Sequence, residues 1–184
     1  MTSQTDVLRT VIATLDEVGL EHMLVGSFAS SVHGERRDTH DIDIVIAMPE
    51  QSIADLHRLF GEEFYFDDES AREAVVSRNM FNIIHYDSGF KVDFWILKND
   101  EFAMTQFARR VPAEIWGVSS YVETPEDTVL SKLLWYKMGH SARQWSDIKG
   151  ILALQKDRLD WDYIKGWAGK VGVSDLLSQL TEEN

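Results

Sequence analysis

The chain has 184 residues, the size of one domain or of a small core with an annex, which excludes a large multidomain assembly. Hydrophobic residues make up 44% of it and charged residues 27%, so it is neither a disordered nor a fibrous chain. With 31 acidic residues against 18 Lys and Arg, the formal charge of −13 disfavours bulk nucleic-acid binding, and the absence of cysteine excludes disulfides and thiolate metal sites.

The first third of the chain predicts helices that alternate with short strands. Helices are predicted at residues 6–18, 28–33 and 52–60, and strands at residues 21–25 and 40–48. Gly19 stands where a helix C-cap glycine would. The acidic stretch at residues 62–73 is interpreted as a solvated surface connection.

The remainder of the chain predicts a hairpin and then a run of helices. Strands are predicted at residues 80–86 and 90–97, a helix at 100–109, an extended segment at 113–122, and helices at 125–138, 142–155, 161–168 and 174–180. Asp87-Ser88-Gly89 supplies the hairpin turn, and Thr124-Pro125 supplies an N-cap with proline at the first helical position.

This order of elements predicts an α+β fold, in which a small mixed sheet with flanking helices precedes a C-terminal helical layer. We expect an α/β core at residues 1–123 and a helical region at residues 124–184 that packs on it. The N-terminus lacks a basic start followed by an apolar run, and no stretch reaches the ~18 apolar residues that span a bilayer. We therefore expect a cytoplasmic protein without a membrane partner.

Two aspartates lie two residues apart in the strand predicted at residues 40–48. Asp41 and Asp43 should therefore point to one face of the sheet, about 7 Å apart. Like charges in one cleft repel each other, so both stay ionised only beside a cation, and oxygen ligands favour Mg²⁺ or Mn²⁺. Asp93 interrupts the apolar strand at residues 90–97. If the two strands are neighbours, three carboxylates converge and could hold two metal ions about 3.5 to 4 Å apart.

Groups that suit phosphate come shortly before the aspartates. Gly26 and Ser27 lie between a strand and a helix, where backbone N–H groups and the helix N-terminus attract phosphate oxygens. Arg37 lies four residues before Asp41, close enough to contact a phosphate or to position that carboxylate by a bidentate pair. Arg36 is suited to either task as well.

Each of these residues also has a purely structural explanation. The Asp41 and Asp43 pair alone is common on solvated strands, and Asp93 could be a surface residue of an edge strand. Gly26 could be a turn glycine and Ser27 an N-cap. The combination of all four features in this order favours the functional interpretation.

The order of these motifs resembles the pattern of the nucleotidyltransferase (polymerase β-like) superfamily: Gly26-Ser27, then Arg37-x-Thr39-x-Asp41-Ile42-Asp43, then Asp93 in an apolar strand. Within it, the chain is similar to the minimal bacterial group that contains the AbiEii-type toxin nucleotidyltransferases. The helical part resembles these proteins through Thr124-Pro125-Glu126-Asp127, Lys132-Leu133, Trp135-Tyr136 and Trp145-x-Asp147-Ile148. The resemblance covers residues 20–155.

The resemblance implies an enzyme that uses Mg²⁺ or Mn²⁺ to move a nucleoside monophosphate from an NTP to an acceptor hydroxyl. The implied catalytic and metal-binding residues are Asp41, Asp43 and Asp93, the last also as base for the hydroxyl. The nucleotide-binding candidates are Gly26, Ser27, Arg37 and Lys132. A solvated outer helix face explains Lys132 and Lys137 equally well. Ser27 replaces the second glycine of the superfamily, and Thr39 stands where aminoglycoside-modifying relatives often have histidine.

Several acceptors and two other functions stay open. The acceptor could be an RNA 3′ end such as that of tRNA, a protein, or a small molecule such as an aminoglycoside, and the group resemblance suggests a toxin with an antitoxin partner. The charge of −13 favours a cationic small molecule or a protein over RNA as the acceptor, although a local basic rim could form from Arg36, Arg37, Arg109, Arg110, Arg143 and Lys149. The alternatives are a catalytically silent domain that binds a nucleotide or partner, and a metal-dependent phosphodiesterase or nuclease.

Overall fold

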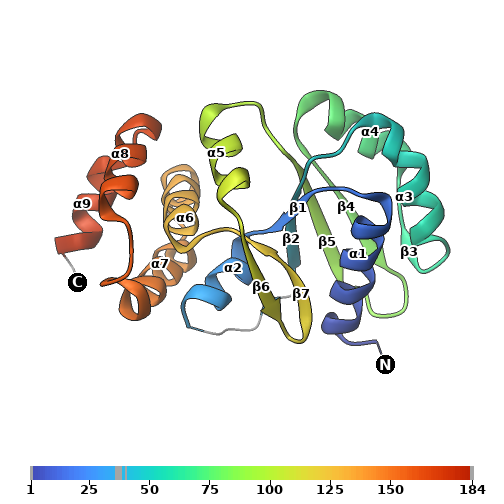
Figure 1. The fold of residues 1–184 in the computed structure, drawn as a ribbon, viewed down its shortest axis with the longest axis horizontal. Helices are drawn as coiled ribbons and strands as arrows, with labels where there is room; N and C mark the ends of the chain where they lie inside the picture. The colour runs from blue at the N-terminus through green and yellow to red at the C-terminus, as the bar shows by residue number, and fades with distance from the viewer. Residues whose placement is uncertain (1, 36–38, 40, 183–184) are drawn as a thin grey trace. The chain divides into compact units, whose positions relative to one another are not determined.

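The computed structural model describes residues 2–35, 39 and 41–182, and the chain forms two compact units (Figure 1). The first unit contains Met1–Leu24 and Thr39–Val122, and the second contains Val25–Asp38 and Glu123–Asn184. The chain therefore leaves the first unit after its first strand, contributes one helix to the second, and then returns.

A mixed sheet forms the centre of the first unit, which we call the sheet unit. Within the described residues it has seven strands, in the order β3-β4-β5-β2-β1-β7-β6. They are β1 His22–Leu24, β2 Asp41–Ile46, β3 Phe64–Tyr65, β4 Met80–His85, β5 Lys91–Ile96, β6 Val111–Ile115 and β7 Val118–Val122. β2 runs parallel to β5 and β1 parallel to β7, while the other neighbours are antiparallel. The mixed sheet with flanking helices confirms the predicted α+β class.

Local sequence signals place the helices of the sheet unit. They are α1 Gln4–Val18, the 3₁₀ turn η1 Glu50–Ser52, α3 Ile53–Phe60, α4 Asp68–Ser77 and α5 Glu101–Arg109. α1 begins at a capping box, in which Ser3 and Asp6 each bond the other's backbone N–H, and it ends at Gly19 with φ +72°. The predicted first helix is confirmed, with its end at Val18 as expected and its start at Gln4, two residues before the predicted one.

The core of the sheet unit lies on one face of the sheet. Phe60 of α3 packs against Phe94 of β5 with 6.2 Å between ring centroids, and Phe94 packs against Phe81 of β4 at 5.2 Å. Ile42 and Ile44 of β2 share this face and are fully buried. Because strand side chains alternate between faces, the odd-numbered residues of β2 and β5 lie on the opposite face.

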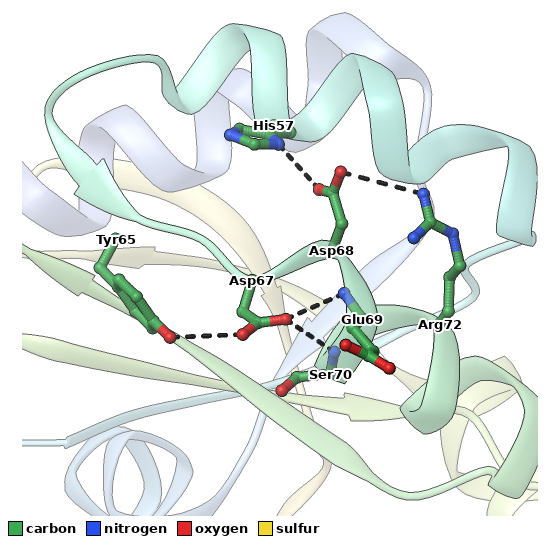
Figure 2. Close-up of polar contacts among 7 residues, drawn as sticks. All are labelled: His57, Tyr65, Asp67, Asp68, Glu69, Ser70 and Arg72. Atoms are coloured by element: carbon green, nitrogen blue, oxygen red, sulfur yellow. Dashed lines mark hydrogen bonds and ion pairs between the residues drawn. The ribbon is translucent and has the colours of Figure 1, made fainter.

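The acidic stretch at residues 62–73, which the sequence suggested to be a surface connection, is partly regular structure. Tyr65 pairs with Ile84 of β4, so β3 adds an edge strand that its own sequence does not signal. α4 follows at once, because the Asp67 carboxylate accepts hydrogen bonds from the backbone N–H groups of Glu69 and Ser70 at its N-terminus (Figure 2). The prediction of a connection was wrong for β3 and α4.

The hairpin around residues 87–89 is confirmed, because β4 and β5 pair in antiparallel register. The segment at residues 113–122, predicted as one extended stretch, is instead a second hairpin of β6 and β7. Trp116 with φ +53° and Gly117 with φ +76° form its two-residue turn. The sequence does not indicate this turn, because tryptophan rarely adopts a positive φ.

The second unit, which we call the helical unit, consists of helices and their connections in the residues that the structure describes. They are α2 Gly26–His33, α6 Pro125–Gly139, α7 Ala142–Gln155, α8 Trp161–Val171 and α9 Ser174–Glu182. α6 contacts each of the other four and is therefore the central helix. It starts as predicted, with Thr124 as N-cap and Pro125 in the first turn. None of the helices in the described ranges is both long and apolar enough to cross a membrane.

The helical unit includes a segment that the sequence assigned to the core at residues 1–123. α2 packs on α6 and α7, so residues 25–38 group with the C-terminal helices. A Cβ placed on Gly34 would meet the backbone nitrogen of Ile151 at 2.9 Å, which no real Cβ contact tolerates. The close backbone approach at Gly34, which sequence reasoning did not anticipate, ties this segment to α7.

Candidate functional site

Three aspartates and one lysine lie on the polar face of the two central strands of the sheet unit. Asp43 of β2 stands directly opposite Asp93 of β5, and Asp41 stands opposite Lys91. Parallel strands are about 4.8 Å apart, so opposite side chains on one face are neighbours. We call Asp41, Asp43, Asp93 and Lys91 the carboxylate row. The predicted adjacency of the two aspartate-bearing strands is therefore present.

Asp93 is the most buried member of the row. Only 6% of the residue is exposed. Its strand lies between β4 and β2, so the explanation of Asp93 as a surface residue of an edge strand is excluded. Burial of a charged carboxylate costs free energy unless a cation or donors compensate for the lost water.

Lys91 supplies that compensation. Its Nζ lies 2.9 Å from Oδ2 of Asp93 and 3.8 Å from Oδ1 of Asp41. The hydrogen bond that Nζ donates to Asp93 raises the pKa of Lys91 above its ordinary value, so the ammonium stays charged. The contact follows from strand periodicity, because Lys91 lies two residues before Asp93 on the same face.

Asp43 is held by a different partner. The indole Nε1 of Trp95, two residues beyond Asp93 on β5, donates a hydrogen bond to Oδ1 of Asp43 at 3.3 Å. Burial raises the pKa of Asp43; the Trp95 hydrogen bond opposes this rise, and the charges of Asp93 and Asp41 add to it. A cation near Asp43 would therefore stabilise the ionised form of its carboxylate.

The row has the donor chemistry of a Mg²⁺ or Mn²⁺ site, since carboxylate oxygens are the ligands these ions prefer. Oδ1 of Asp93 is buried and accepts no hydrogen bond from the residues that the structure describes, so an acceptor is left for a cation. In the described ranges, however, no three carboxylate or imidazole side chains group as metal ligands. Asp41 is mostly exposed, and the Lys91 ammonium lies within 4 Å of both Asp41 and Asp93. Asp43 and Asp93 fit an ion as a pair, and metal binding by all three aspartates stays a prediction.

Sequence reasoning missed three residues that accompany the aspartates. Lys91 and Trp95 flank Asp93 at a spacing of two, and this period alone could have placed them on its face. Asn82 of β4 pairs with Asp93 from the other side, so polar side chains occupy one level of three adjacent strands. Its polarity within the apolar run of β4 was the available signal.

Three of the residues proposed to hold phosphate, Gly26, Ser27 and Lys132, lie in the helical unit. Gly26 begins α2 with φ +62°, a conformation that strongly favours glycine, and Val25 is the N-cap. The explanation of Ser27 as the N-cap is therefore wrong; its carbonyl accepts a hydrogen bond from Ser31 Oγ at 2.9 Å. Arg37 and Arg36 lie outside the described residues.

Lys132 is neither solvated nor exposed. It is 3% exposed, and its Nζ donates hydrogen bonds to Asp147 Oδ2 at 2.7 Å and to Gln144 Oε1 at 3.0 Å. The salt bridge ties α6 to α7. Lys137, on the exposed side of α6, donates to the backbone oxygen of Gly172 at 2.9 Å. The explanation of Lys132 as a surface lysine is wrong, while its contact with phosphate stays a prediction.

A buried acid lies close to this pair in the helical unit. Glu123 is 2% exposed, and its Oε1 accepts a hydrogen bond from Ser131 Oγ at 2.7 Å. Burial raises the pKa of Glu123 to about 7, and the Asp127 charge adds to the rise. We call Glu123, Lys132 and Asp147 the buried helical cluster.

Comparison with known proteins shows which solved structures share the fold of this chain. No family model and no curated protein sequence matches the chain. Among solved structures, the lincosamide antibiotic adenylyltransferase LnuA with lincomycin bound superposes with a TM-score of 0.54 at 11% identity, over 83% of this chain and 98% of its own. The antibiotic-resistance factor ANT(2″)-Ia superposes with a TM-score of 0.52 at 12% identity, over 98% of this chain and 94% of its own.

A second structure of ANT(2″)-Ia, in complex with adenylyl-2″-tobramycin, gives a TM-score of 0.52 at 14% identity, over 91% of this chain and 96% of its own. These identities are low, so the likeness concerns the fold. The finer resemblance to the AbiEii-type group stays a prediction. The chain has the fold of the lincosamide antibiotic adenylyltransferase LnuA and of the antibiotic-resistance factor ANT(2″)-Ia.

Proposed function

We propose that the chain is a nucleotidyltransferase that depends on Mg²⁺ or Mn²⁺. The observation that carries this proposal is the in-register pair of Asp43 and Asp93. A buried oxygen of Asp93 has no hydrogen-bond partner in the described part of the chain, as expected of a carboxylate that awaits a cation. The same reaction class is supported by the fold, which is shared with the adenylyltransferase LnuA and with ANT(2″)-Ia, a protein solved in complex with adenylyl-2″-tobramycin.

In the proposed reaction, the oxygen of an acceptor hydroxyl attacks the α-phosphorus of an NTP. The bond from that phosphorus to the bridging oxygen breaks, and pyrophosphate leaves with the electron pair. Asp93 accepts the hydroxyl proton, directly or through water. Asp43 and Asp93 would hold a divalent ion, with Asp41 beside them, and such an ion neutralises the charge that develops on the phosphate oxygens.

The triphosphate is proposed to bind Gly26 and Ser27, with Arg37 as a cationic contact. The positive φ of Gly26 supports this, because a residue without a Cβ lets the backbone come close to an oxygen. Lys132 is proposed as a further phosphate contact, and its ammonium already donates hydrogen bonds to Asp147 and Gln144. Its primary role is therefore to join α6 and α7.

We propose a small cationic molecule with a hydroxyl group as the acceptor. The formal charge of −13 attracts cations and repels an RNA backbone. Both superposed transferases are named for antibiotics, and one is bound to an adenylylated tobramycin. Transfer to tRNA or to a protein, as in a toxin with an antitoxin, is the other outcome of the test.

The experiment is a transfer assay on the purified protein with each of the four α-³²P-labelled NTPs and Mg²⁺. Total RNA, lysate protein and an aminoglycoside panel are offered as separate acceptors. The matched variants are Asp93→Asn, which removes one carboxylate charge of the row, and Asp162→Asn, which removes an exposed carboxylate of α8. Label on the cationic small molecules with wild type and Asp162→Asn, but not with Asp93→Asn, supports the proposal.

The other outcomes are equally informative. Label on RNA or protein keeps the reaction and replaces the acceptor. Binding of an NTP without transfer to any acceptor assigns the chain to the silent nucleotide-binding alternative. Fragmentation of the offered RNA without pyrophosphate formation indicates a nuclease and overturns the transferase.

A further inference from the structure

The carboxylate row already contains a cation of its own. The Lys91 ammonium lies 2.9 Å from Asp93 and 3.8 Å from Asp41, on the face that carries both proposed metal-binding aspartates of the central strands. Three carboxylates and one ammonium sum to −3 + 1 = −2. Lys91 therefore offsets part of the negative charge with which the three carboxylates would attract a divalent ion.

Lys91 and a divalent ion cannot both bind Asp93 without repulsion. Asp93 is buried, so water screens little of the interaction between cations at its two oxygens. One of those oxygens already bonds Lys91, and the other has no partner among the residues described. A divalent ion therefore binds beside an Asp93 carboxylate whose charge Lys91 already neutralises in part.

We propose that Lys91 is a built-in counter-ion that competes with the divalent ion for Asp93 and makes metal binding depend on the nucleotide. The phosphates of a bound NTP supply the negative charge that lets the ammonium and the ion share the row. The inference rests on the proposed function, because it needs the row to be the metal site. Lys91 acts through Asp93 and is a positioning residue.

The side chain of Lys91 suits this role physically. It is the first residue of β5, and about a third of its side chain is exposed. A flexible four-carbon stem lets the ammonium turn from Asp93 to a phosphate oxygen while the backbone stays in the sheet. A shorter or neutral side chain at this position would leave the buried carboxylate without its cation.

The test measures Mn²⁺ affinity by electron paramagnetic resonance, without nucleotide and with each of the four α,β-methylene NTPs. The variants are Lys91→Met, Lys91→Arg and, as matched control, Lys98→Met, which removes an exposed lysine just beyond β5. We expect wild type to bind Mn²⁺ roughly tenfold more tightly with nucleotide than without. Lys91→Met should bind Mn²⁺ alone roughly tenfold more tightly than wild type and gain less from nucleotide. Lys91→Arg and Lys98→Met should behave as wild type.

An affinity of Lys91→Met for Mn²⁺ alone that equals or falls below that of wild type overturns the inference. If circular dichroism shows that this variant is unfolded, Lys91→Gln takes its place. A wild type whose Mn²⁺ affinity is the same with and without nucleotide overturns the inference without any variant. The proposed function has its own control: Mn²⁺ binding with nucleotide that survives in Asp93→Asn would place the metal elsewhere and refute the site itself.

Discussion

The two units of this chain differ in how their buried charged side chains are paired. In the sheet unit, the carboxylate row leaves a buried Asp93 oxygen without a partner in the described part of the chain. In the helical unit, Lys132 and Asp147 form a salt bridge of 2.7 Å that is almost completely buried. A salt bridge with satisfied geometry holds two helices together, whereas a surplus of negative charge with an open acceptor suits a ligand. Substitutions in the carboxylate row should therefore impair function, and substitutions in the Lys132–Asp147 salt bridge should lower stability.

The largest expected effect is on activity. Asp43→Asn should lower nucleotidyl transfer by about a thousandfold or more, because the row loses a metal ligand. The free energy of unfolding should stay the same or rise, since the variant removes a carboxylate whose pKa burial and neighbouring charges raise. Transfer assays and urea denaturation on the same sample test both parts. If Asp43→Asn is fully active, or if it loses activity because it is less stable, the proposed difference between the two units is wrong.

The next effect is on stability. Lys132→Met should lower the free energy of unfolding by about 3 to 5 kcal/mol, because it leaves the Asp147 charge buried without its ammonium. Lys132→Met combined with Asp147→Leu should recover much of that loss. Lys137→Met is the matched control on the exposed side of α6 and should cost about 1 kcal/mol. A folded Lys132→Met protein of normal stability with weakened NTP binding would instead support contact with phosphate.

A pH-dependent effect comes from Glu123. Its pKa is about 7 in the folded protein against 4.5 ordinarily, so between these pH values the folded chain holds a proton that the unfolded chain has lost. The stability contributed is fully present below pH 4.5 and is lost as the pH rises through 7. Glu123→Gln should remove this loss and be more stable than wild type at pH 8 by a few kcal/mol.

Thermal or urea unfolding at pH 4.5, 6 and 8 measures that difference. The exposed Glu114→Gln of β6 is the control and should follow wild type at each pH. Because other groups titrate in the same range, the informative quantity is the variant minus wild type. Parallel curves for wild type and Glu123→Gln would show that the acid is not protonated in the fold.

The smallest effect concerns Trp95. Trp95→Phe removes the N–H that bonds Asp43 and should weaken Mn²⁺ binding with nucleotide severalfold, the equivalent of about 1 kcal/mol. Trp161→Phe removes a comparable indole bond, to the Lys156 carbonyl oxygen in the helical unit, and should leave Mn²⁺ binding unchanged. Equal effects of the two variants would mean that the Trp95 bond does not position Asp43.

The sequence predicted the parts of the fold that depend on neighbouring residues. Gly19 is a local signal of a helix end and Thr124 of a helix start, and in the structure they are the C-cap of α1 and the N-cap of α6. Strand periodicity likewise placed Asp41 and Asp43 on one face. β3 was missed because its pairing with β4 is a tertiary interaction, and its two residues have no pattern of their own.

The sequence predicted those features of the candidate site that depend on the periodicity of a single strand. Asp43 and Asp93 stand opposite each other as proposed, but the position of Lys91 depends on the register between β2 and β5, which no single segment encodes. Lys132 is buried because Asp147 lies in the following helix, fifteen residues away. Charge partners of this kind become visible only when two elements pack together.

The excursion of the chain into the helical unit has a consequence for its synthesis. α2 leaves the ribosome early, whereas the helices it packs against, α6 and α7, are encoded after the entire sheet unit. The sheet unit can pair its strands while translation continues, but the Gly34 contact with α7 has to wait for the last third of the chain. A protein truncated after β7 would therefore expose the apolar side of α2, and we expect such fragments to bind chaperones or aggregate.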